Sequence, residues 1–138
     1  MRRALTPLLA ASIVVGCVTT PTPTATALTR PGTLLTNAFA TAAPGTGRIF
    51  VKRDSIMWNV GNGCAHRIYI DGTAVAELRV AQSVSIYVKP GDHILSAELT
   101  SICNGTSETA VTVREGETKT YRTSATGDGN ITVQPTAF

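Results

Sequence analysis

The sequence contains little charge and no long apolar run. Asp, Glu, Lys and Arg together make up 15% of its 138 residues. The main apolar run, from Leu8 to Val15, is too short for a bilayer-spanning helix, which needs about 20 predominantly apolar residues. No helical hydrophobic period occurs along the chain, whereas apolar and polar residues alternate repeatedly. A membrane-spanning helix and a helical bundle are therefore not expected.

The chain also lacks the basic excess that nucleic acid requires. It has 12 Lys and Arg against 9 Asp and Glu. Two of the basic residues, Arg2 and Arg3, belong to the export signal described below, and without them the balance is 10 to 9, a net charge of +1. Because such a chain has no basic stripe for phosphate contacts, nucleic acid is not expected as a partner.

No catalytic motif is present. The chain has no Gly-x-Ser-x-Gly sequence, and His93, which follows Asp92, is the candidate base. A hydrolase would need Ser85 or Ser96 to meet this histidine beside an oxyanion hole. The simpler interpretation is that His93 begins a strand and hydrogen-bonds across the Pro90–Gly91 turn. We therefore predict no enzymatic activity, no catalytic residue, no metal and no cofactor.

The N-terminus has the pattern of a bacterial export signal. Basic residues at positions 2 and 3 precede the apolar run, and Gly16 and Cys17 follow it. Val14–Cys17 resembles the lipobox of bacterial lipoproteins, in which the cysteine receives a diacylglycerol and becomes the first residue of the mature protein. We predict a lipoprotein signal peptide over residues 1–16 and lipidation of Cys17. An ordinary signal peptide that contains a cysteine is the alternative.

The residue after the cysteine bears on the location of the protein. It is Val18 rather than Asp, which resembles lipoproteins that are sent to the outer membrane. The resemblance implies a cell-envelope protein, anchored in the outer membrane and facing the periplasm or the cell surface. The membrane is then one partner, through the lipid anchor, and an envelope protein or glycan that the sequence does not identify is the other.

The remaining two cysteines form an even pair. Because an exported protein folds in an oxidising compartment, we predict a disulfide between Cys64 and Cys103. The loop that it closes would stabilise the fold by about 4 kcal/mol in the chain-entropy model. The alternative is a metal site made by these cysteines with His66 and His93, although zinc ligands usually have closer paired spacings.

Residues 17–46 have the composition of a linker. Thr, Ala and Pro dominate, and small side chains offer little area to bury. We predict that the lipidated cysteine is followed by a disordered tether as far as residue 46. Leu34, Leu35 and Phe39 are the exceptions, and whether they dock on the folded domain stays open.

Residues 47–138 have the pattern of an all-β domain. The alternation is clearest from Arg67 to Leu99, where Asp71–Gly72 predicts a hairpin and Pro90–Gly91 a turn. Short apolar segments recur every 8–12 residues along the domain, separated by turn residues. The prediction is an antiparallel β-sandwich of seven or eight short strands.

Two motifs carry a family resemblance. Ile68–Gly72 and Val88–Leu95 have the strand, Asp-Gly, Pro-Gly and strand plan of PEGA-type β-domains. The same plan resembles an uncharacterised family of bacterial envelope lipoproteins. The resemblance implies a β-domain of the cell envelope without an established activity.

The outward positions of the predicted strands supply a candidate binding face. Tyr69, Tyr87, Arg67 and Lys89 would point outward from neighbouring strands, and Lys52, Arg53 and Arg79 would extend the face. Aromatic rings stack on sugars and arginine binds acidic groups, although a plain solvated face is the simpler interpretation. The predicted function is a non-enzymatic, membrane-tethered lipoprotein that acts as an interaction or structural module. The alternative is a carbohydrate- or peptide-binding module that uses this face or a sheet edge.

Overall fold

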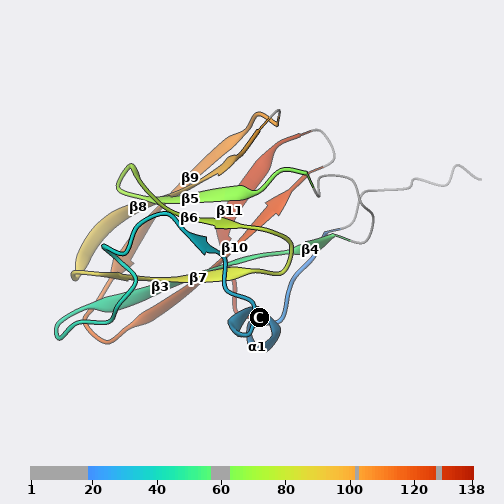
Figure 1. Ribbon diagram of the computed structural model, residues 1–138. Coiled ribbons are helices and arrows are strands. Elements are labelled where there is room, and N and C mark those ends of the chain that lie inside the picture. The colour runs from blue at the N-terminus through green and yellow to red at the C-terminus, as the bar shows by residue number, and fades with distance from the viewer. Residues whose placement is uncertain (1–18, 57–62, 102, 127–128) are drawn as a thin grey trace, which may run out of the picture.

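Two β-sheets packed face to face make up the folded part of the chain (Figure 1). The computed structural model describes residues 19–56, 63–101, 103–126 and 129–138. The predicted signal peptide over 1–16 and Cys17 lie outside the described residues. The two packed sheets confirm the predicted all-β sandwich.

Each sheet combines strands that are distant in sequence. The five-stranded sheet has the order β2 (Thr33–Leu34), β6 (Thr73–Leu78), β5 (His66–Ile70), β8 (Gly91–Leu99) and β9 (Thr106–Val113). The four-stranded sheet has the order β11 (Ile131–Pro135), β10 (Thr118–Ala125), β3 (Gly47–Arg53) and β7 (Ser83–Val88). A short additional pair joins β1 (Thr19–Thr20) to β4 (Ser55–Ile56), and the single described helix is α1 (Thr24–Leu28).

The predicted hairpin is confirmed, but the strand that follows it belongs to the other sheet. Asp71 and Gly72 have φ values of 49° and 78°, as a type I′ turn between β5 and β6 requires. After β6 the chain turns at Arg79–Gln82, where the backbone N–H of Gln82 donates to the carbonyl oxygen of Arg79 at 3.0 Å. It then enters β7, which pairs with β3 in the other sheet.

One strand pair differs from the predicted antiparallel arrangement. β3 and β10 run parallel, in a register from Arg48↔Thr118 to Arg53↔Thr123. A parallel pair needs a long crossover connection. Here the intervening chain supplies it by forming strands β5, β6, β8 and β9 of the opposite sheet.

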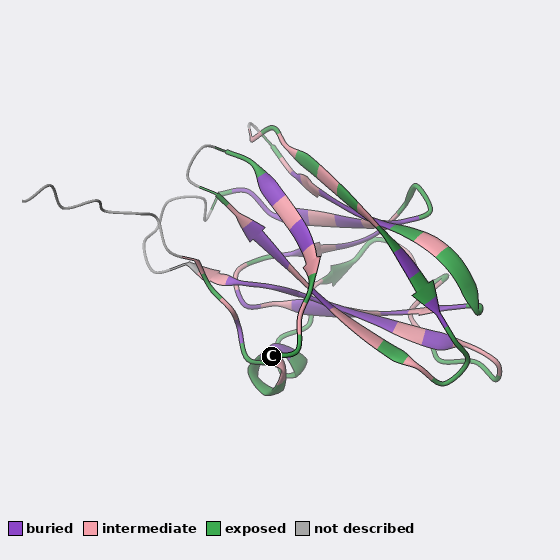
Figure 2. Cartoon of the chain, turned by 180° about the vertical axis from the view of Figure 1, so that it is seen from behind, coloured by how far each residue is buried: buried purple, intermediate pink, exposed green. Residues whose placement is uncertain are grey.

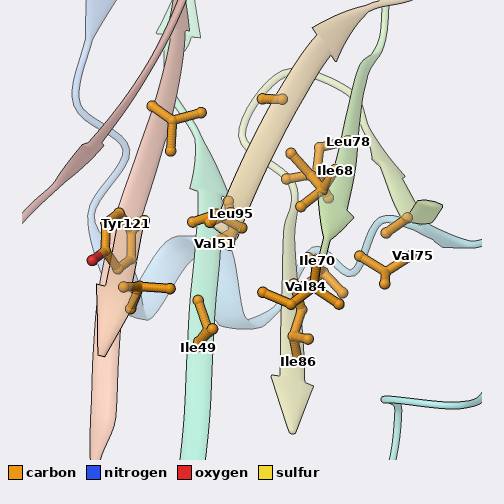
Figure 3. Close-up of a cluster of buried hydrophobic side chains, with 14 of the residues drawn as sticks. Ile49, Val51, Ile68, Ile70, Val75, Leu78, Val84, Ile86, Leu95 and Tyr121 are labelled. Atoms are coloured by element: carbon orange, nitrogen blue, oxygen red, sulfur yellow. The ribbon is translucent and has the colours of Figure 1, made fainter. Parts of the chain in front are cut away.

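The core lies between the two sheets and follows the period-two alternation of the strands. Ile49 and Val51 of β3 are fully buried against residues such as Ile68, Leu78 and Leu95 from the other sheet (Figure 3). Buried and more exposed positions alternate along β5 and β7 (Figure 2). The predicted disulfide between Cys64 and Cys103 is also present, and its two cysteines are 39 residues apart.

The predicted disordered tether over 18–46 is wrong for residues 19–46, which lie along the sandwich. The backbone N–H of Ser83 in β7 donates to the carbonyl oxygen of Arg30 at 3.0 Å, and that of Gly32 donates to the carbonyl oxygen of Ser83 at 2.8 Å. A Cβ at Gly32 would lie 2.7 Å from the carbonyl oxygen of Glu77, so this crossing is too close for a side chain. Strand edges present unpaired backbone groups, and the backbone of this segment bonds to several of them, which requires no apolar side chain.

The same segment then bridges the two sheets on their open side. β2 pairs with β6, and the N–H of Leu35 donates to the carbonyl oxygen of Val75 at 3.0 Å. The segment returns to β7, where the N–H of Tyr87 donates to the carbonyl oxygen of Phe39 at 2.9 Å. Phe39 packs against the core, whereas Leu34 is 47% exposed. We call residues 28–40 the edge strap.

Candidate functional site

The residues of the predicted binding face do not share one face. Arg67 and Tyr69 point outward from β5 in the five-stranded sheet, whereas Tyr87 belongs to β7 and Lys89 follows it in the four-stranded sheet. The prediction treated these strands as neighbours. It is wrong because the turn at Arg79–Gln82 carries the chain from one sheet to the other.

On the five-stranded sheet the candidate side chains are occupied with each other. Arg67 donates from Nε and Nη2 to Oε1 of Glu77 at 3.0 and 2.7 Å, and this bond raises the pKa of Arg67. The hydroxyl of Tyr69 donates to the carboxylate of Glu98, which raises the pKa of Tyr69. This face therefore satisfies its own polar groups and presents no unpaired anchor at Arg67 or Tyr69.

Two cations expected on the exposed face are buried. Lys52 is 0% exposed, because α1 and Phe138 cover the outer side of β3; its Nζ donates to Oγ1 of Thr24 at 3.0 Å and to the backbone oxygen of Phe138. Burial lowers the pKa of Lys52, and the nearby Asp54 partly opposes this effect. Arg53 is 1% exposed and lies toward the core side of the strand.

Arg53 organises a buried polar cluster with His66. Its Nη1 donates to the backbone oxygens of Cys64 and Leu78 at 2.8 and 3.0 Å. The His66 ring is 0% exposed, and its Nδ1 lies 2.8 Å from Oγ1 of Thr123. Burial, with the charge of Arg53, lowers the pKa of His66 to about 3. This histidine stays neutral at ordinary pH, which suits a packing role rather than proton transfer.

The alternative metal site is not formed. Cys64 and Cys103 are bonded to each other, and His66 and His93 lie near opposite ends of β5. Within the described ranges, no group of three or more His, Cys, Asp or Glu side chains is placed to hold a metal ion.

His93 forms a clasp between two turns. Its Nδ1 lies 2.7 Å from Oδ2 of Asp71, and its Nε2 lies 2.8 Å from the carbonyl oxygen of Lys89. Burial alone lowers the pKa of His93, but these hydrogen bonds outweigh it and the net effect is a raised pKa. The predicted bond across the Pro-Gly turn is confirmed. Ser96, one of the two serines that a hydrolase would need beside this histidine, donates to Glu108 at 3.0 Å instead.

An apolar groove borders β7, the strand that carries Ser85, the other serine considered for a hydrolase. It lies between the edge strap and the four-stranded sheet and has a volume of about 270 Å³. Its lining is mostly apolar and includes Leu28, Leu34, Ala40, Phe50, Val84 and Ser85.

The edge of β7 is unpaired at Ser85, which lines the groove. The N–H groups of Ser83 and Tyr87 point away from β3 and are bonded to the edge strap. Alternate residues of an antiparallel strand direct their N–H and C=O to the same side, so those of Ser85 also point away from β3. Among the described residues, none hydrogen-bonds to the backbone of Ser85 on that side. The groove therefore contains one unpaired backbone donor and acceptor.

Sequence reasoning did not find this groove. Ser83 and Ser85 alternate with apolar residues, which indicates an outward strand face, but no local signal shows that residues 28–40 would form the second wall.

Arg48 and Tyr87 form a smaller polar and aromatic patch beside the groove. They are directly opposite each other on β3 and β7, and the guanidinium carbon of Arg48 lies 5.4 Å from the ring centroid of Phe50. A cation over an aromatic ring is a favourable contact. Tyr87 belongs to the predicted face, whereas Arg48 was not predicted to be part of it.

Comparison with known proteins gives no match, whether to a family model, to a curated protein or to a solved structure. The resemblance to PEGA-type lipoproteins therefore stays a prediction. No helix in the described part of the chain is both long and apolar enough to cross a membrane.

Proposed function

We propose that this chain is a lipid-anchored, non-enzymatic protein of the cell envelope whose β-sandwich binds a partner. The lipobox-like Val14–Cys17 supports the anchor, and the bond between Cys64 and Cys103 suits an oxidising compartment. The PEGA-like motifs support the same location. The clasp around His93 gives that residue a structural role, which supports a binding rather than a catalytic function.

The partner that the groove suits best is an extended peptide. The observation that carries this proposal is the open backbone donor and acceptor of Ser85 at a strand edge. An extended peptide binds such an edge by strand addition, with its side chains in adjoining pockets. The volume of about 270 Å³ is small for a ligand site, so one or two residues with small aliphatic side chains would enter.

Carbohydrate binding is the second candidate, and the Arg48–Tyr87 patch favours it. An aromatic ring beside a guanidinium is suited to a sugar that carries an acidic group. Arg48 is also above Phe50, which lines the groove, so the two candidates share a border.

Peptide binding is tested by changing the backbone of Ser85 without changing its surroundings. Ser85→Pro removes the outward N–H, whereas Ser85→Ala keeps it and is the matched control. Titration calorimetry with peptides selected from a random library should show binding to the control and at least a tenfold weaker Kd for the proline variant, the size of about 1.4 kcal/mol. Equal affinity of the peptide for both variants would contradict strand addition. If the wild type binds a sugar on a glycan array and Tyr87→Ala does not, carbohydrate binding would be favoured instead.

The anchor is tested separately by mass spectrometry of the exported protein. A mature N-terminus at Cys17 carrying acyl chains is expected, and Cys17→Ala should leave the protein unprocessed. An unmodified cysteine in the exported chain would contradict the lipoprotein assignment.

A further inference from the structure

The chain leaves almost no spacer between the proposed lipid anchor and the sandwich. This inference rests on the proposed acylation of Cys17. Thr19 already pairs with Ile56, and Thr20 pairs with Ser55. Two residue steps separate Cys17 from Thr19, and they span at most about 7 Å. An acylated cysteine would therefore hold this end of the sandwich close to the lipid headgroups.

The end of the molecule nearest to this attachment also contains α1 and Phe138. Oγ1 of Thr22 donates to the backbone oxygen of Arg53 at 3.0 Å, which fixes the chain between β1 and α1. The hydroxyl of Thr24 donates to the backbone oxygen of Phe138. Both views of the chain place the C-terminus beside α1 (Figures 1 and 2). We call residues 19–28 with Phe138 the anchor pole.

The anchor pole exposes large apolar side chains. Phe138 is 75% exposed and Leu28 is 54% exposed, the two highest values among the exposed large apolar residues of the described chain. α1 carries no charged residue. Apolar side chains beside a lipid attachment enter the interfacial region of a bilayer and add to the anchoring energy.

The distribution of charge also favours contact between the anchor pole and a membrane. The sequence has no Asp or Glu from Cys17 to Arg53, and Arg30, just after α1, is exposed. The acidic side chains Glu98 and Glu108 belong instead to β8 and β9 of the five-stranded sheet, whereas α1 packs against β3 of the four-stranded sheet. Anionic headgroups attract the first surface and repel the second.

We propose that the anchor pole is a bilayer-contacting surface that orients the sandwich, with Leu28 and Phe138 in the headgroup region. The five-stranded sheet and its self-paired polar face are then directed away from the membrane. The groove, which Leu28 also lines, opens close to the lipid surface. A peptide bound there would be held next to the membrane rather than at the end of a long tether.

The test uses the lipidated full chain in vesicles of phosphatidylethanolamine and phosphatidylglycerol with brominated acyl chains. Trp58→Phe removes the sole tryptophan, and an indole is then introduced by Phe138→Trp or, as the matched control, by Ile94→Trp. Ile94 is 43% exposed on β8 of the other sheet. We expect bromine to quench the fluorescence of the first indole and to leave the second unchanged.

A second measurement covers the case in which the tryptophan variants do not fold. Amide hydrogen exchange of the lipidated wild type on vesicles, compared with an unlipidated chain of residues 18–138 in the same buffer, should show slower exchange at residues 24–28 and 136–138. Residues 108–112 of β9 should exchange equally in both.

The outcomes separate this inference from the function on which it rests. Mass spectrometry of the same sample reports whether Cys17 is acylated. Acylated protein with no quenching of the indole from Phe138→Trp and no slowing at α1 would overturn the orientation and leave the lipid anchor intact. An unacylated Cys17 would overturn both.

Discussion

The outer faces of the two sheets are completed in different ways. On the five-stranded sheet, side chains of adjacent strands pair with each other, as Arg67 does with Glu77 and Tyr69 with Glu98. On the four-stranded sheet, Phe50 and Lys52 are covered by the N-terminal segment, so that both are nearly inaccessible. The two outer faces are therefore completed differently, because the five-stranded sheet pairs side chains of opposite charge with each other, whereas Phe50 and Lys52 of the four-stranded sheet are buried by the segment that crosses them.

The two sheets also differ in how they are fastened. The disulfide joins the start of β5 to the loop between β8 and β9, so it closes only the five-stranded sheet. The edge strap is bonded to β7 and β6 and closes the open side of the sandwich. Four experiments test this comparison, in order of expected effect.

Removal of the disulfide should have the largest effect. The double variant Cys64→Ser with Cys103→Ser should lower the free energy of unfolding by about 4 kcal/mol, because the unfolded chain regains the entropy of the closed loop. Urea denaturation measures the loss. A change below about 1 kcal/mol would show that the strap and core suffice to hold both sheets.

A matched pair of aromatic truncations compares the covered face with the open one. Phe50→Ala should lower the free energy of unfolding by about 3 to 4 kcal/mol, because Phe50 is 1% exposed and its removal leaves a cavity beneath the strap. Tyr69→Ala, on the open face, should cost about 1 kcal/mol or less. Similar losses in urea denaturation would mean that the strap does not cover Phe50 in solution.

Acid should weaken the contact between the inner faces through His66. Its folded pKa of about 3 is below the unfolded value of about 6.5, so the unfolded state binds the extra proton and stability falls as pH drops between these values. The slope is about 1.4 kcal/mol per pH unit, or about 3 kcal/mol by pH 4. His66→Asn should remove this slope from stability curves measured by thermal unfolding. If the pH slope of stability is the same in His66→Asn as in the wild type, the slope does not come from a buried His66.

The His93 clasp should have the smallest effect on stability, and its pH dependence should have the opposite sign to that of His66. Because the pKa of His93 is raised in the folded state, its contribution to the free energy of unfolding is complete below about pH 6.5. This contribution is lost as pH rises through the folded pKa. The lowered pKa of Asp71 means that the bond is also lost in strong acid. His93→Gln should therefore cost less than about 1 kcal/mol, and only in the interval between the two pKa values. A cost that grows above pH 8 would contradict the ion pair.

Several elements of the fold follow from local pattern. The alternation in β7 predicted its buried residues, and Asp71–Gly72 predicted the hairpin, because strand period and turn geometry are properties of adjacent residues. Pairing of Cys64 with Cys103 followed from an even count of cysteines in a chain that was predicted to be exported. The candidate site was predicted less well. Tyr69 and Tyr87 have the same outward pattern, and nothing local shows that their strands belong to different sheets.

The sequence by itself determined that the chain forms short strands, where its tight hairpin lies and which side chains of β7 face inward. In β3 it did not predict that Arg53 faces the core. Only the tertiary structure decided that β3 runs parallel to β10, that Lys52 is buried and that residues 28–40 close the groove. The physical reason is that alternation reports the burial of side chains one strand at a time. Hydrogen bonds at strand edges, such as that from Tyr87 to Phe39, use backbone groups that every non-proline residue has.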